Sequence, residues 1–102
     1  MKKRTHATEI AAIRKLIGRL NGYAYVLHQG AGGGKAYKGL CGTPGIPDMF
    51  VMQGGHSFFV EVKVGKDRLR VSQQEFIERG KRHGVDVVVG DLDAVIEFLG
   101  LK

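Results

Sequence analysis

The sequence predicts an α/β domain in which a mixed sheet is flanked by helices, in the order α-β-β-β-α-β-α. Three observations support this fold class. Apolar residues recur at helical spacing near both ends of the chain, alternating stretches typical of strands lie between them, and glycines or capping residues separate the segments. The 102 residues, 43% of them hydrophobic, suffice for one modest core, so we expect a single domain over 1–102.

The first helix is expected to be capped by Thr5 or Thr8, and its apolar stripe ends near the NG pair at 21–22. The alternating, aromatic segment YAYVLH at 23–28 predicts a strand. The glycine-rich segment at 29–47 shows no periodicity and is long for a connection in a compact domain, which indicates a functional or mobile loop.

Two strands, 48–52 and 56–64, are expected to form a hairpin around Gly54 and Gly55. Ser72 and Glu75 then form an S-x-x-E capping box for a helix that ends at Gly84. The apolar segment 85–89 predicts a buried strand, and Asp91 is expected to cap the last helix.

The hairpin brings charged residues together. A turn centred between Gly54 and Gly55 places Asp48 directly opposite Glu61, with Cβ atoms about 4.5–5.5 Å apart. Because side chains alternate along a strand, Lys63 shares this face with Glu61, while the valines between and beside them point toward the core.

Two facing carboxylates repel each other, and a divalent cation between them would relieve the repulsion. Asp48, Glu61, the backbone carbonyl of Val62 and waters form an all-oxygen ligand set suited to Mg²⁺ or Mn²⁺. Lys63 is placed to neutralise part of the charge and to reach a phosphate oxygen or an attacking water. The alternative interpretation is that Glu61 and Lys63 are a solvent-exposed pair and that Asp48 merely begins a strand.

Glu9 extends the buried stripe of the first helix, from which its carboxylate can reach the same cluster. An acidic residue in the first turn also suits the helix dipole, so both interpretations stay open. The four histidines and Cys41 lack the spacing of a zinc site, and we interpret the histidines as structural or surface residues.

The net charge of +6 and a pI near 9.7 favour a polyanionic partner. Lys35 and Lys38 in the glycine-rich loop, and Lys66, Arg68 and Arg70 after the hairpin, are candidates for contacts with DNA phosphates, although such clusters are often only solvated faces. Residues 1–5 are compatible with a disordered basic arm. The single cysteine and the lack of a secretory signal or an apolar run of membrane-spanning length favour a cytoplasmic protein without a membrane segment.

The segments IPD at 46–48 and EVK at 61–63 resemble the motif of the PD-(D/E)xK nuclease superfamily, and the predicted order of elements resembles its restriction-endonuclease-like core. More narrowly, GIPD, FVEVKVGKDRLRVSQQEFIERGKRHG and VVVGDLDAVIEFL are similar to the VRR-NUC family, the virus-type replication-repair nuclease domain. In that family a glutamine opens the helix after the lysine and a glycine closes it, and Gln73 and Gly84 stand at those places.

The resemblance implies roles for five residues. Asp48 and Glu61 would hold the metal, and Lys63 would orient or activate the nucleophilic water. Gln73 would support Lys63 or contact the substrate backbone, and Glu9 would be a further acidic residue able to complete the metal shell.

The resemblance also implies a biological setting. The chain is similar to stand-alone phage and prophage members, which act in a phage or bacterial host cell, form homodimers and are related to Holliday-junction-resolving nucleases. The implied substrate is branched DNA, with duplex DNA as a further partner. The alternative is a non-catalytic basic nucleic-acid-binding module on the same fold, although a pure binder gains nothing from the acidic pair.

Overall fold

The computed structural model describes residues 3–27 and 43–101, which contain three helices and four strands. In chain order these elements are α1 (His6–Arg19), β1 (Tyr23–Val26), β2 (Met49–Gln53), β3 (His56–Val62), α2 (Val71–Arg82), β4 (Val87–Gly90) and α3 (Leu92–Phe98). Together they form a small α/β domain with a mixed sheet, compatible with the nuclease-like fold expected from the sequence. Most of the glycine-rich loop, with Lys35 and Lys38, lies outside the described residues.

The four strands form one sheet in the order β1-β2-β3-β4. The β1–β2 and β2–β3 pairs are antiparallel, whereas β4 returns through α2 to lie parallel to β3. The β2–β3 hairpin turns at Gly54 and Gly55, whose φ angles of 58° and 85° suit glycine, and Gln53 pairs with His56. The predicted register of this hairpin is therefore confirmed.

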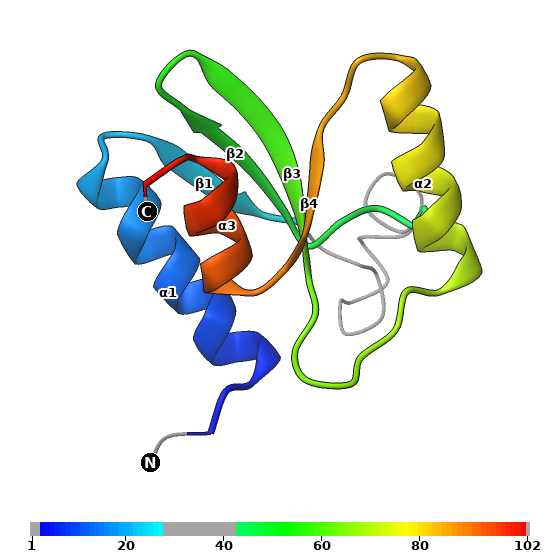
Figure 1. Cartoon of the computed structure of the whole chain (residues 1–102), viewed down its shortest axis with the longest axis horizontal. Coiled ribbons are helices and arrows are strands. Elements are labelled where there is room, and N and C mark those ends of the chain that lie inside the picture. Colours follow the sequence, from blue (N-terminus) through cyan, green and yellow to red (C-terminus); the bar gives the residue numbers. More distant parts are fainter. Residues whose placement is uncertain (1–2, 28–42, 102) are drawn as a thin grey trace.

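The two faces of the sheet are covered unequally. Figure 1 shows α1 and α3 together on one face and α2 on the other. The face under α1 and α3 carries the fully buried apolar core, formed by Ile13, Ile17, Met49, Val51, Phe58, Val60, Val62, Val88 and Val95. Within the described chain α2 has no fully buried residue, and its Phe76 ring packs edge-on against Phe59 at a centroid distance of 5.3 Å. The α2 side of the sheet is therefore only partly covered.

The second helix begins differently from the prediction. Ser72 lies inside α2, and the residue before the helix is Arg70, whose backbone N–H donates to Oε1 of Gln73 at 2.8 Å. The predicted Ser72–Glu75 capping box is wrong because the glutamine performs that role from the third helical position. The helix ends at Arg82 with His83 as its C-cap, and the predicted closing glycine, Gly84, follows with a positive φ of 77°.

The strand bounds also differ from the prediction: β1 ends at Val26, β2 lies one residue later than expected, and the end of β3 and the start of β4 are shifted for a visible reason. β3 ends at Val62 because the N–H of Val64 donates to the Asp67 carboxylate at 3.1 Å and so leaves the ladder. β4 begins at Val87 because the N–H of Val85 donates to the Gly80 carbonyl at 2.7 Å and belongs to the end of α2. Asp91 caps α3 as predicted, its side chain accepting from the N–H of Ala94. None of the described helices has the length and apolar character needed to cross a bilayer.

Candidate active site

The two predicted carboxylates come together at the α2 side of the sheet. Met49 pairs with Val60, so Asp48, the residue before β2, stands opposite Glu61 in β3. Both are buried, with exposed fractions of 8% for Asp48 and 2% for Glu61. A solvent-exposed Glu61–Lys63 pair, the alternative considered from the sequence, is therefore wrong for Glu61.

Asp48 is held by the backbone of the neighbouring strand. Its Oδ2 accepts a hydrogen bond of 2.7 Å from the N–H of Val62, the residue after Glu61. This bond uses a strand N–H at the end of the antiparallel ladder and fixes the direction of the carboxylate. The aspartate thus has a structural reason to lie beside β3 and a fixed position relative to Glu61.

Glu61 has one satisfied oxygen and one unsatisfied oxygen. Its Oε2 accepts from the Gln73 side-chain amide at 2.9 Å and lies 3.5 Å from the Lys63 ammonium nitrogen. Its Oε1 is buried without a hydrogen-bond partner among the described residues. Burial, assisted by the negative charge of Asp48 and only partly opposed by Lys63, raises the pKa of Glu61 to about 7.

A buried carboxylate oxygen without a partner is unusual and costs stability. A divalent cation next to this oxygen and Asp48 would remove the deficit. No three His, Cys, Asp or Glu side chains group as a metal site within residues 3–27 and 43–101, so the side chains here supply fewer ligands than a closed metal cage needs. Mg²⁺ is commonly bound by only one or two carboxylates, with waters and substrate phosphates completing its shell. The carboxylate pair fits an ion of that kind and not structural Zn²⁺.

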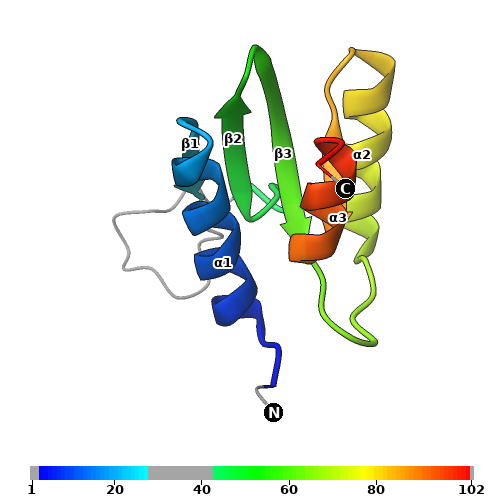
Figure 2. The same cartoon turned by 60° about the vertical axis from the view of Figure 1, so that its left-hand side comes forward.

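The structure adds a residue that the sequence interpretation missed. His6, the first residue of α1, has its Nε2 atom 2.7 Å from the carbonyl oxygen of Val62 and 3.7 Å from Oδ2 of Asp48. Figure 2 shows the start of α1 and the end of β3 at the same end of the molecule. Nε2 donates to the carbonyl, which is the backbone oxygen predicted to face the ion. His6 is exposed, as expected of a surface residue, and its imidazole also contacts the backbone and carboxylate of the candidate site.

Glu9 is buried, as its place on the apolar stripe predicts, but its contacts are to α3. Its Oε1 accepts from the N–H of Leu92 at 2.9 Å, the first residue of that helix. Arg4 lies beside it, with Nε 3.9 Å from Oε2 of Glu9 and NH1 2.7 Å from Oδ2 of Asp91. These contacts join α1, α3 and the segment before α1, and a metal-binding role for Glu9 stays a prediction.

Gln73 and the basic residues lie on the connection from β3 to α2. Gln73 holds Glu61 and not Lys63, while its other amide atom caps α2. Lys66, Arg68 and Arg70 are exposed in the segment between Lys63 and the helix. Their side chains are free to reach a polyanion that approaches the carboxylates from this side.

Comparison with protein families gives a match that covers most of the chain. The family model described as the VRR-NUC domain matches residues 10–91, which include Asp48, Glu61, Lys63 and Gln73. No curated protein and no solved structure gives a significant match.

Proposed function

Because the chain belongs to the VRR-NUC family, whose model matches 10–91 of its 102 residues, we propose that it is a metal-dependent endonuclease that hydrolyses DNA phosphodiester bonds. Family membership itself implies a nuclease. The observation that carries the more specific proposal is the unsatisfied Oε1 of Glu61, buried opposite a second carboxylate, Asp48. Such a pair is costly in a small protein unless it binds a cation.

The proposed cofactor is Mg²⁺ or Mn²⁺, held by Asp48, Glu61 and the carbonyl of Val62, with Glu9 as a further candidate ligand. When bound, such an ion supplies Lewis-acid polarisation of the scissile phosphate and lowers the pKa of a coordinated water. Oxygen ligands favour these two ions over softer metals. Whether one or two ions take part depends on whether a further acidic ligand such as Glu9 joins the pair.

The protein's own side chains then have distinct tasks. Lys63 is half-buried, with its ammonium 3.5 Å from Oε2 of Glu61. Its proposed task is to orient the attacking water or a phosphate oxygen. Gln73 keeps the Glu61 carboxylate in position through its 2.9 Å hydrogen bond. Lys66, Arg68 and Arg70 are proposed to position the DNA backbone by contacts with phosphates, a role that we extend to Lys35 and Lys38.

We propose branched or junction DNA as the preferred substrate and a homodimer as the active form, as in junction-resolving phage nucleases. A physical argument supports the dimer. Specific protein–DNA complexes bury about 1,000–2,500 Å² of protein surface. This is a large share of the 7287 Å² that one chain exposes.

The test compares wild type with Asp48→Asn, Glu61→Gln and Lys63→Ala on labelled junction, duplex and single-stranded DNA, with Mg²⁺, Mn²⁺ or EDTA. We expect wild type to cut only with a divalent ion, and each variant to bind DNA without cutting it. Glu75→Gln, which removes an exposed carboxylate on α2, is the matched control and should cut normally. If Lys63→Ala cuts as well as wild type, the role assigned to the lysine is wrong.

The second candidate is a nucleic-acid-binding module without catalysis, which the net charge of +6 favours. It predicts that wild type binds DNA but cuts none of the substrates with either ion. It also predicts a melting temperature that does not respond to Mn²⁺, since a protein without a metal site gains no stability from the ion.

A further inference from the structure

The side of the sheet that faces α2 is arranged in three rows of side chains across the strands. The register places residues of the same row opposite one another on neighbouring strands. From the turn of the hairpin toward the candidate active site, the rows are Tyr23, Met52 and Ser57, then Tyr25, Phe50 and Phe59, then Asp48 and Glu61. The carboxylates are thus one end of a surface whose other end is rich in aromatic and apolar groups.

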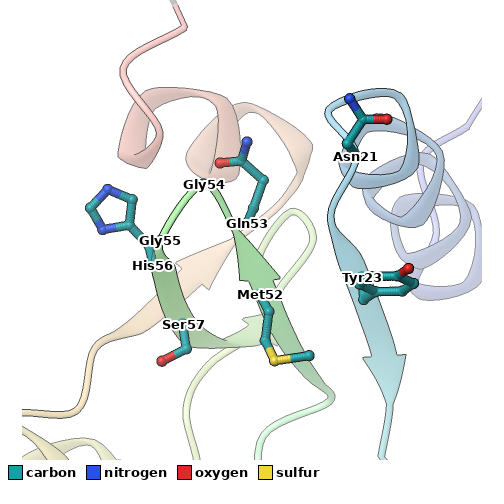
Figure 3. A pocket seen from close by; sticks show the side chains of 8 residues that line it. All are labelled: Asn21, Tyr23, Met52, Gln53, Gly54, Gly55, His56 and Ser57. Carbon is teal, nitrogen blue, oxygen red and sulfur yellow. The ribbon is translucent and has the colours of Figure 1, made fainter.

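The row farthest from the carboxylates is open to solvent. Tyr23 is 65% exposed and Met52 is 38% exposed, which is high for large apolar side chains on a sheet. Both line a hollow of about 380 Å³ beside the hairpin turn. Figure 3 shows the polar side chains of Asn21, Gln53 and His56 around the same hollow.

We propose that this hollow, with Tyr23 as its stacking surface, binds an unpaired base of the nucleic-acid substrate. Exposed aromatic rings form stacking platforms for single-stranded bases because every base has a π-face. The Asn21 amide and the Ser57 hydroxyl can pair with a base edge, and no carboxylate occurs among the lining residues that the structure describes. An aliphatic protein ligand would leave those polar groups without partners.

The position of the hollow connects it to the proposed reaction. Tyr23 stands opposite Met52, four residues along β2 from Asp48, which corresponds to about 13 Å. A few nucleotides of single strand bridge this span on the same face of the sheet. Tyr25, 49% exposed, lies in the row between them and can support the strand on its way.

This inference rests on the proposed function and deepens it, because it assigns a binding site for the unpaired bases of a branched substrate. The enzyme would prefer DNA with unpaired nucleotides next to the cut, such as a branch point or a flap, over uninterrupted duplex. In a duplex the bases are stacked on each other and are not available to Tyr23.

The test measures binding in EDTA, where no cleavage occurs. The probes are a fluorescently labelled single-stranded oligonucleotide and the duplex of the same sequence. Tyr23→Ala should weaken single-strand binding about 5- to 100-fold, with a smaller effect on duplex. Tyr23→Phe keeps the ring and should bind like wild type. Val26→Ala is the matched control, because Val26 is also exposed on β1 but points to the opposite face.

Cross-linking locates the contact directly. An oligonucleotide with one 5-iodouracil base, irradiated in the complex, should become attached to the peptide that contains Tyr23. Attachment only to peptides elsewhere would overturn the inference. Equal single-strand affinity of Tyr23→Ala and wild type would also overturn it. If, in addition, Tyr23→Ala converted a dimer into a monomer, the face would instead join two copies of the chain.

The outcomes separate this inference from the proposed function. Cleavage by wild type with no effect of Tyr23 on single-strand affinity would leave the nuclease standing and remove the base-binding hollow. Tyr23-dependent single-strand binding with no cleavage under any metal would support the hollow and contradict the nuclease.

Discussion

Replacing Glu61 by glutamine should stabilise the metal-free protein at neutral and alkaline pH. The pKa of Glu61 is raised from an ordinary 4.5 to about 7, mainly by burial and by the charge of Asp48. The folded state therefore holds the proton more tightly than the unfolded state. The contribution of this proton to the free energy of unfolding is fully present below pH 4.5. It is lost as the pH rises toward 7 and stays lost above that pH. The difference corresponds to about 3 kcal/mol in the free energy of unfolding.

Glutamine keeps the local hydrogen bonding while removing the charge. Its side-chain oxygen can still accept from Gln73, and a neutral amide group takes the place of the unsatisfied Oε1. No titration occurs at this position in the variant. The gain in stability over wild type should therefore grow from pH 5 to pH 8.5 by about 2–3 kcal/mol.

Urea unfolding in EDTA at pH 5, 7 and 8.5 measures this difference. Glu75→Gln, with an exposed carboxylate, should follow wild type at each pH. Mn²⁺ at a hundred times its dissociation constant should restore about 2.7 kcal/mol to wild type at pH 8.5 and nothing to Glu61→Gln. Parallel pH profiles for wild type and Glu61→Gln would refute the argument that a buried, uncompensated charge limits the stability of the metal-free fold.

Two further predictions concern the surroundings of the carboxylates, both measured by urea unfolding in EDTA. Asp48→Asn should be about 1–3 kcal/mol more stable than Asp48→Ala, because only asparagine can still accept the Val62 N–H, while both variants lose the same charge; equal stabilities would show that this bond is unimportant. Gly45→Ala should lower the free energy of unfolding more than Gly54→Ala. Both glycines have positive φ, and this strain alone costs about 1 kcal/mol at Gly54, but only a Cβ at position 45 would also collide with the Ser72 backbone in α2. The reverse order would contradict the close approach at Gly45.

Local rules were sufficient to predict the carboxylate pair. The two glycines of the hairpin determine its register, and the alternation of side chains then places Asp48 and Glu61 on one face. Both steps depend on residues within fifteen positions of each other in the sequence. Local rules did not predict the cap of α2. The S-x-x-E pattern and Gln73 are competing local signals, and only the contact with Glu61 favours Gln73.

The contacts of His6 and Glu9 depend on how α1 crosses the sheet, for which the sequence carries no local signal. The apolar stripe predicts that Glu9 is buried, but not that the start of α3 offers it a free N–H at Leu92. His6 precedes the apolar stripe, so the sequence predicts only an exposed residue at the start of the helix. Its contact with the Val62 carbonyl spans 56 positions of sequence and appears only once α1 and β3 are placed together.

The unequal covering of the sheet explains how so short a chain tolerates a buried carboxylate pair. The face under α1 and α3 carries the apolar core, where Ile13, Ile17 and Phe58 are almost fully buried. Burial of this core stabilises the fold enough to offset the cost of burying the carboxylates on the other face. α2 covers only part of the second face, held by Phe76 against Phe59 and by Gln73 against Glu61. Loss of the Phe76 contact would therefore loosen the glutamine that positions the carboxylate, so packing and chemistry on this face depend on the same helix.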